Sequence, residues 1–389
     1  MRIKLYISSA LILLTVNLHA QHDLLHQAVE DYKNGDLVKA QEAIDKASQN
    51  SETAGEPKVW YYKGAIYKDI YKAKELDNHS SGARINSVNA FIKCISLGYS
   101  EYHEESRKAF KYLASTMYND AARDMNAEQY KMAFLNFESY LEFESKVNPA
   151  VIDTMAIFHA GYTAYMDHNY DKAIKYLSMA MEVNYHDPAL YYFLGKSYLN
   201  NKDYKNAEVF FTQGIQKYPD DRKFARILVN LYQESGKQKE LANILTQEIP
   251  KEPGNTDYLV LLGITYEKLM AEDSVKKKEY LIKAGESYSK ALKIEPDNLK
   301  ANYNLGLLYY NQAVDKINVL PLDTDLIALE DIQQECKDLF KQALPFMEKA
   351  YQLNPRNKET LIGLSGIYFS LHDIENSNRI KTELNFLEK

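Results

Sequence analysis

Large apolar side chains recur at intervals of three and four residues along nearly all of the chain after residue 22. This spacing places them on one stripe of a helix, so the pattern predicts a succession of amphipathic helices. Gly161, Gly195, Val229 and Gly263 follow one another at intervals of 34 residues. A fixed interval of this length is typical of helix pairs that stack in a row, because one pair alone cannot bury its apolar stripes.

Small residues and prolines indicate where these helices approach one another and where they end. Gly195, Ala207 and Gly214 fall at positions where a larger side chain would hold neighbouring helices apart. Proline cannot continue an α-helix, and four prolines are placed to end the second helix of a pair. They are Pro219, Pro253, Pro296 and Pro355. The predicted fold is therefore all-α.

The residues around Gly195 carry the full pattern of a known repeat, namely Tyr191, Leu194, Gly195, Tyr198, Ala207, Phe211 and Pro219. Only Gly214 departs from it, because alanine is usual there. On these residues the chain resembles the tetratricopeptide-repeat family, and the resemblance covers nearly all of the chain after its first twenty residues. It implies an α-solenoid, a right-handed superhelix of about nine helix pairs. The other pairs are recognised by Ala28 and Ala47, Trp60 and Ala90, Ala133 and Phe137, Gly161 and Ala173, Val229, Gly263 and Ala284, Gly306 and Ala343, and Leu361 and Leu364.

Three pairs are longer than the others, with insertions near residues 70–83, 270–280 and 312–336. Each insertion falls between the first and the second helix of its pair, so all three are expected to project from one edge of the array. The largest predicts a lengthened first helix, a loop and a long return helix from about Thr324. Leu320 and Leu322 then have two interpretations. They cover an end of the stack or contact a partner, or the lengthened helices simply pack on each other.

The N-terminus has the features of a cleavable export signal over residues 1–20. Arg2 and Lys4 precede an apolar run from Leu5 to Val16, and Ala20 is a small residue at the expected cleavage site. Leu18 is larger than is usual there, so an uncleaved short anchor is the alternative. After the signal we expect repeats over residues 21–150 and over residues 151–389. The expected location is the periplasm or the exterior of the cell, with no membrane insertion after cleavage.

Composition narrows the classes of partner. Removing Arg2 and Lys4 leaves 45 basic against 54 acidic residues, a net charge of about −9, which does not attract nucleic acid or anionic lipid. Tyrosine is unusually frequent at 32 residues, and its polar-tipped ring suits half-buried positions between helices. Cys94 and Cys336 are far apart in an elongated fold, so both are predicted to be buried free thiols.

The resemblance places a binding site on the inner, concave face, which the first helix of each pair lines. The matching positions combine aromatic rings with a basic middle, a combination that anchors protein interfaces. Lys196, Lys223 and Arg226 are expected to form a basic patch for carboxylates of an extended peptide. Packing between helices is the alternative role for the tyrosines. The candidate residues are Phe158, Tyr162, Tyr165, Tyr192, Lys196, Lys223, Arg226, Asn230, Lys300, Tyr303 and Tyr310.

Motifs for catalysis, cofactor binding and metal binding are missing from the sequence. His22 and His26 are one helical turn apart, but two nitrogen ligands without a third make a poor metal site. The sequence therefore favours a non-catalytic scaffold or adaptor of the bacterial cell envelope that binds a protein or peptide and needs no cofactor. The alternative is a structural spacer or a self-associating subunit, which implies a homo-oligomer.

Overall fold

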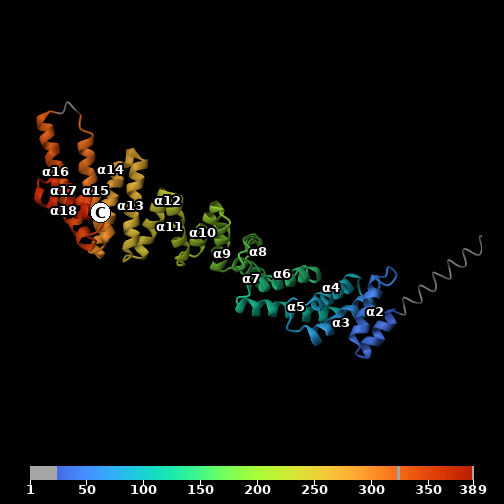
Figure 1. The fold of residues 1–389 in the computed structure, drawn as a ribbon. Coiled ribbons are helices and arrows are strands. Elements are labelled where there is room, and N and C mark those ends of the chain that lie inside the picture. Colours follow the sequence, from blue (N-terminus) through green and yellow to red (C-terminus); the bar gives the residue numbers. More distant parts are fainter. Residues whose placement is uncertain (1–23, 322–324, 388–389) are drawn as a thin grey trace, which may run out of the picture. The chain divides into compact units, whose positions relative to one another are not determined.

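The computed structural model describes residues 24–321 and 325–387, and every regular element in these ranges is a helix (Figure 1). The chain divides into two compact units, Met1–Pro219 and Asp220–Lys389. The predicted export signal, Leu322 and Thr324 lie outside the described residues. The all-α solenoid is confirmed, while the hand of its superhelix and the division at residue 150 stay predictions.

The first unit contains five helix pairs. A helix over residues 24–33 pairs with α2 (Leu37–Gln49), and each later pair packs against the one before it. The later pairs are α3 (Pro57–Lys74) with α4 (Gly82–Ser96), α5 (His103–Asn126) with α6 (Tyr130–Val147), α7 (Thr154–Met166) with α8 (Tyr170–Glu182), and α9 (Pro188–Asn200) with α10 (Tyr204–Lys217).

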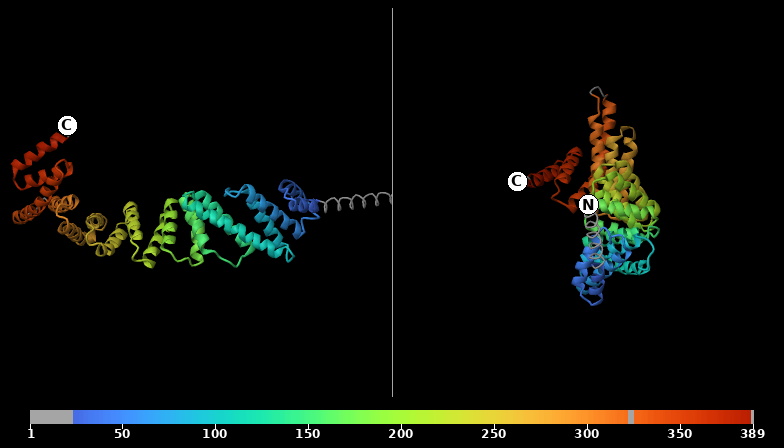
Figure 2. Two further views of the ribbon diagram at one scale, coloured as in Figure 1. Left: turned by 90° about the horizontal axis from the view of Figure 1, so that it is seen from below. Right: turned by 90° about the vertical axis from the view of Figure 1, so that its right-hand side faces the viewer.

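The second unit contains four further pairs, which Figure 2 shows from two more sides. They are α11 (Lys223–Ser235) with α12 (Gln238–Glu248), α13 (Thr256–Glu272) with α14 (Lys277–Ile294), α15 (Leu299–Asn318) with α16 (Leu326–Leu353), and α17 (Lys358–Ser370) with α18 (Ile374–Leu387). The short 3₁₀ helices η1 (Ile249–Lys251) and η2 (Ser274–Lys276) lie in the connections. With those of the first unit, the nine predicted pairs are all present in the described chain.

Close packing within each helix pair explains why glycine recurs at one position of the first helix. A Cβ atom added at Gly195 would lie 2.5 Å from Phe211 Cε1, a ring atom on the second helix of the same pair. The same conflict would arise between Gly64 and Phe91, between Gly161 and Leu177, between Gly263 and Tyr288, and between Gly306 and Met347. The glycine therefore lets the two helices approach until a large side chain of the second covers the backbone of the first.

The turn inside a compact pair repeats a local conformation. The second residue after the first helix adopts a left-handed backbone, as Lys202 does with φ 62°. The next residue then caps the second helix, as Asp203 does by accepting a hydrogen bond from the Asn206 amide at 3.1 Å. Gly35 with Asp36, His168 with Asn169, and His372 with Asp373 repeat this arrangement. This turn keeps the two helices of a pair antiparallel and closely spaced.

The three insertions are built mainly of helix. α3 and α13 each run several residues beyond the 13 of a compact first helix, and α15 and α16 reach 20 and 28 residues. The lengthened α15 and α16 pack on each other, since Ala313 is buried in one cluster with Cys336 and Phe340. Both cysteines are buried and free, as predicted.

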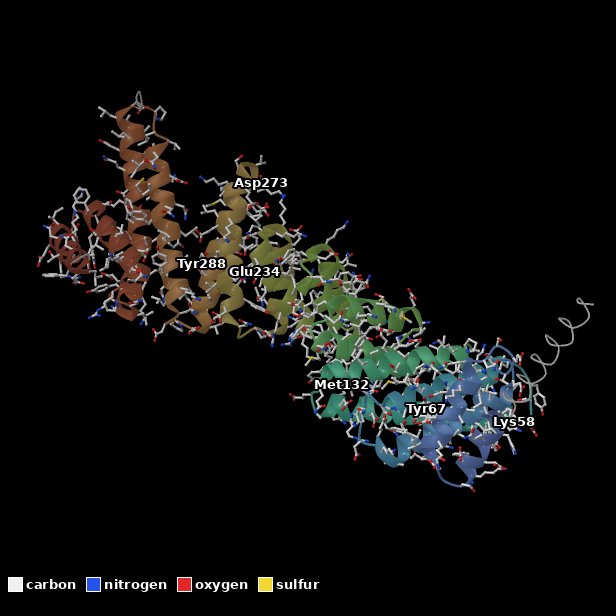
Figure 3. All side chains as sticks on the ribbon, turned by 45° about the vertical axis from the view of Figure 1, so that its right-hand side comes forward. Lys58, Tyr67, Met132, Glu234, Asp273 and Tyr288 are labelled. Carbon is white, nitrogen blue, oxygen red and sulfur yellow. The ribbon has the colours of Figure 1, made fainter. Side chains whose placement is uncertain are left out.

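Tyrosine hydroxyl groups fasten neighbouring helices to one another. Seven tyrosines of the described chain donate a hydrogen bond to a carboxylate on another helix or at its cap. Figure 3 labels two of these tyrosines, Tyr67 on α3 and Tyr288 on α14. Tyr67 donates to Asp45 on α2 at 2.7 Å, and Tyr288 donates to Glu267 on α13. The remaining pairs are Tyr32 with Asp69, Tyr140 with Asp153, Tyr176 with Glu138, Tyr351 with Glu383, and Tyr368 with Glu348. These pairs give a structural role to seven of the 32 tyrosines.

The tyrosine–carboxylate pairs predict a loss of stability in alkaline solution. Burial, and then the hydrogen bond to Asp45, raises the pKa of Tyr67 from 10.0 to about 12, and burial also raises the pKa of Tyr288. The folded state therefore keeps protons that the unfolded chain releases near pH 10. Stability from these groups is complete below pH 10 and is lost as the pH rises through 12. Urea unfolding at pH 8 and pH 11 measures the loss, and equal midpoints would contradict the prediction.

Candidate partner-binding surfaces

Three of the predicted residues meet in the first unit around a ring that the sequence analysis did not select. The rings of Tyr162 and Tyr165 on α7 lie 5.0 and 5.1 Å from the ring of Phe193 on α9. Tyr192 lies 5.1 Å from the same ring. All four side chains are partly exposed. We call these four residues the α7–α9 face, which spans the first helices of two successive pairs.

The side chains of the α7–α9 face are partly buried, and this burial affects its tyrosine hydroxyl groups. It is the main cause that raises the pKa of Tyr162 and of Tyr165 above its ordinary value. Lys196 lies one helical turn beyond Tyr192 on α9 and forms no ion pair with an acid of the described chain. An aromatic surface with one available ammonium group therefore lies in this part of the first unit.

Phe158 differs from the other candidates on α7. Its side chain is only 8% exposed, and its ring stacks on Tyr185 at 4.5 Å in the turn after α8. It therefore contributes to the core between the fourth and fifth pairs and offers a partner little surface.

Lys223, Arg226 and Asn230 are exposed on α11 in the second unit, whereas Lys196 is on α9 in the first. Arg226 is already engaged within the chain, because it and Arg222 donate hydrogen bonds to Glu252 at 3.0 and 2.8 Å. A hydrogen bond from Asn255, followed by those from the two arginines, lowers the pKa of Glu252 to about 2. A partner carboxylate at Arg226 would thus compete with Glu252.

A second surface lies on α15 and α17. Lys300, Tyr303 and Tyr310 are on α15, where both tyrosines pack at the edge of the core that α15 shares with α17. A Cβ atom added at Gly366 would lie 2.9 Å from the Tyr310 hydroxyl oxygen, so this ring reaches α17. Burial is the main cause that raises the pKa of Tyr303, and Glu359 adds to it.

The same surface includes two residues that the sequence analysis did not select. Ile362 and Phe369 are 58% and 59% exposed and lie on the same side of α17 as Gly366. The repeat register was the signal that could have found them, because they occupy the positions on α17 that Tyr303 and Tyr310 occupy on α15. Leu361 and Leu364 already marked this pair in the sequence, but its surface positions were not compared with those of α15.

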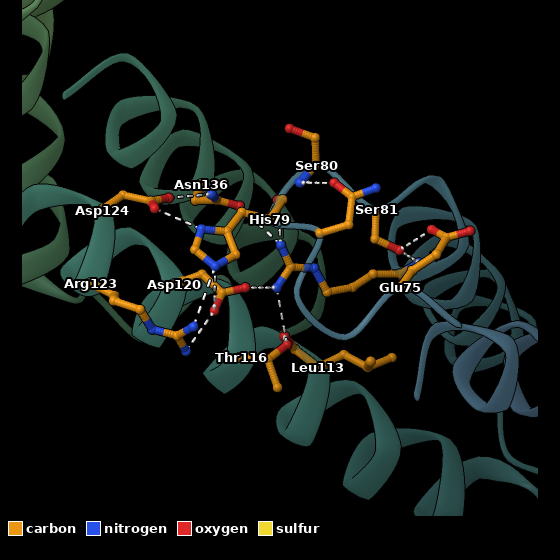
Figure 4. Close-up of polar contacts among 12 residues, drawn as sticks. Glu75, His79, Ser80, Ser81, Leu113, Thr116, Asp120, Arg123, Asp124 and Asn136 are labelled. Carbon is orange, nitrogen blue, oxygen red and sulfur yellow. Dashed lines mark hydrogen bonds and ion pairs between the residues drawn. The ribbon is translucent and has the colours of Figure 1, made fainter. Parts of the chain in front are cut away.

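The first unit also contains a buried ionic network that no sequence pattern predicted (Figure 4). Arg84 on α4 is 1% exposed and donates hydrogen bonds to Asp120 on α5 at 2.5 Å and to Asn136 on α6 at 3.1 Å. It also donates to the backbone carbonyl of His79 at 2.6 Å. The guanidinium group therefore joins three helices to the loop between α3 and α4.

The imidazole of His79 completes this network. Its Nδ1 atom lies 2.6 Å from an oxygen of Asp124, which is one helical turn from Asp120 on α5. Two acids, a histidine and an arginine thus hold the first insertion against the core. Within the described residues, no group of three or more histidine, cysteine and acidic side chains could hold a metal ion. The role that these contacts support is structural, because they attach the loop between α3 and α4 to α5 and α6.

Comparison with known proteins gave several structural similarities of low identity. MamA from AMB-1 is 17% identical, with 52% of this chain and 92% of that chain covered and a TM-score of 0.36. YrrB, described as a TPR protein with an unusual peptide-binding site, is 21% identical, with 55% of this chain and 96% of that chain covered and a TM-score of 0.37. A TPR repeats protein from Bacteroides fragilis is 20% identical, with 65% and 97% covered and a TM-score of 0.30. Similarities at this level carry no argument about function.

No curated protein matches the chain. Residues 203–309 match the family model TPR-S, Tetratricopeptide Repeats-Sensor. This match begins at the cap of α10 and ends within α15, and helix pairs of the same construction occur on both sides of it. The glycine of the first helix also meets a large side chain of the second helix in pairs outside the match, as Gly64 and Gly161 show. Residues 203–309 therefore match a tetratricopeptide-repeat family, and the described chain on both sides of them has the same helix-pair fold.

Proposed function

We propose that this protein is a non-catalytic scaffold that holds an extended segment of another protein on the first helices of successive repeats. The observation that carries the proposal is the α7–α9 face, where Tyr162, Tyr165, Tyr192 and Phe193 form one partly exposed aromatic surface. Stacked repeats build extended surfaces of this kind, and aromatic side chains bury a large area at a low entropic cost.

The charge of the surface indicates the chemistry of the segment. Lys196 follows the aromatic rings by one helical turn on a chain of net negative charge. Its ammonium group favours a carboxylate in the partner, and the rings favour apolar or aromatic side chains beside it. The segment we propose is therefore extended, apolar and acidic at one position.

The proposed location is the bacterial cell envelope or the exterior of the cell. Its support is the basic, apolar and small-residue pattern of residues 1–20. No helix of the described chain is long and apolar enough to cross a membrane.

The test is a capture experiment with a matched pair of double variants. Tyr192→Ala with Lys196→Glu alters the α7–α9 face, and Tyr204→Ala with Lys205→Glu makes the same change on the second helix α10, where Tyr204 is 54% exposed. We expect the first variant to lose at least about 90% of the captured partner, a tenfold weakening that corresponds to about 1.4 kcal/mol. The second should retain it.

The outcomes separate the candidate functions. Both variants must keep the thermal unfolding of the native protein, so that loss of capture reports the surface. Equal capture by the two variants would remove the α7–α9 face from the account. Capture of further copies of the same chain, with light scattering that depends on concentration, would favour the self-associating subunit instead.

A further inference from the structure

The longest hairpin carries a cavity of about 620 Å³ on one flank. We call residues 313–318 of α15 and 326–340 of α16 the arm, which extends past α17 and α18 (Figure 1). The wall of the cavity combines apolar and polar residues in about equal number. Its apolar residues include Ile317, Leu320, Leu329, Ile332 and Phe340, and its polar residues include Glu330, Gln333, Lys337, Ser370 and His372.

The two flanks of the arm differ in what covers them. α14 packs against α15, and near the arm Lys277 forms an ion pair with Asp315 at 2.8 Å. On the other flank the next pair is too short, because α17 and α18 have 13 and 14 residues against 20 and 28 in α15 and α16. Ser370 and His372, at the end of α17, therefore form the base of the cavity.

The cavity continues an interface that helices already use. Lower on the hairpin, Leu364 and Ile367 of α17 are buried in one cluster with Phe340 and Met347 of α16. Phe340 belongs both to this cluster and to the wall of the cavity. The surface above the end of α17 is thus the same groove between α15 and α16 that receives a helix below.

Apolar side chains remain exposed on the arm and at Val319, directly after its α15 part, where a folded chain normally places polar ones. Ile317 is 48% exposed, and Val319, Leu326 and Ile327 are 75–77% exposed. The charged residues Glu330 and Lys337 lie two helical turns apart on α16, and neither forms an ion pair with another residue of the described chain. The groove therefore offers an apolar floor with an acidic and a basic group on its rim.

We infer that the arm binds an amphipathic helix of a partner protein, laid in the groove as a continuation of the α17 layer. The arm part of α16 spans 15 residues, about 22 Å, which matches a helix of about four turns. The helix should carry apolar residues at intervals of three and four, a basic residue facing Glu330 and an acidic residue facing Lys337. This site is distinct from the α7–α9 face and does not depend on the proposed function.

A displayed library of helical peptides about four turns long, selected on the full chain, tests this inference. Enriched peptides should show the apolar periodicity together with the two charges. Ile317→Asp should weaken their binding about tenfold or more, because a carboxylate then enters the apolar floor. Ile294→Asp on α14 is the matched control, since Ile294 is also 48% exposed, and it should bind the peptides as the native chain does.

A charge reversal gives a second readout that a folding defect does not produce. Lys337→Glu changes an exposed residue, and peptides selected on this variant should carry a basic residue in place of the acidic one. Selection that yields no periodic peptides, or peptides that bind Ile317→Asp equally well, would overturn the inference. Concentration-dependent dimerisation that Ile317→Asp abolishes would assign the groove to a second copy of this chain.

Discussion

Replacing Arg84 by alanine is expected to lower the free energy of unfolding of the helices around it by about 3–5 kcal/mol, the usual cost of removing one partner from a buried ion pair. Asp120 is 5% exposed and would keep its negative charge without its closest cation. The carbonyl of His79 and the amide of Asn136 would lose a donor as well. The loop between α3 and α4 would then be held to α5 by His79, through its contact with Asp124.

Hydrogen exchange measures this effect locally, which matters because a repeat array does not unfold in one step. Peptides from α4, α5 and α6 should exchange about 10²- to 10⁴-fold faster in the Arg84→Ala variant, and peptides from α13 to α18 should be unchanged. Arg84→Lys keeps the charge but not the planar fork, so it should restore only part of the protection. Exchange in α4 that equals that of the native protein would contradict the structural role of the network.

Replacing Gly195 by alanine is expected to destabilise the fifth pair, although alanine is the better helix former. The added Cβ atom would lie 2.5, 2.8 and 2.9 Å from three ring atoms of the fully buried Phe211. Overpacking of this kind costs about 1–3 kcal/mol, which exceeds the gain in helix propensity of about 0.5–1 kcal/mol.

Gly285 on α14 supplies the matched control for this substitution. A Cβ atom there would meet only Leu308 Cδ2, at an ordinary contact distance of 3.5 Å. Gly285→Ala should therefore stabilise the second unit by about 0.5–1 kcal/mol, the opposite sign to Gly195→Ala. Adding Phe211→Leu to Gly195→Ala should recover part of the loss. Equal effects at the two glycines in urea unfolding would show that close packing does not explain the repeat.

The repeated features of the fold were predictable because they are local and periodic. The interval from Gly161 to Gly263 located the helix pairs, and the structure supplies its cause in the large side chains that cover each glycine. The longest insertion was expected as two lengthened helices joined by a loop. α15 ends at Asn318 and α16 begins at Leu326, close to the expected Thr324.

The unpredicted features depend on contacts that the repeat does not fix. Arg84 and Asp120 are 36 residues apart, on the second helix of one pair and the first helix of the next, and neither falls at a position that the repeat pattern fixes. Phe193 lies next to the predicted Tyr192 on α9, and its contacts with two rings of α7 depend on how α7 and α9 pack. The sequence presented Arg226 as free to bind a partner carboxylate. Its own partner, Glu252, lies 26 residues later in the connection between α12 and α13, which the repeat pattern does not describe.

The most direct measurement of the central claim is photo-cross-linking of the partner from single positions. A photoreactive phenylalanine analogue replaces Tyr192 on the α7–α9 face in one protein, and Tyr204 on α10 in another. The account predicts an adduct from position 192 that maps to one extended segment of another protein, with no such adduct from position 204. The same adducts from both positions, or none from position 192, would contradict it.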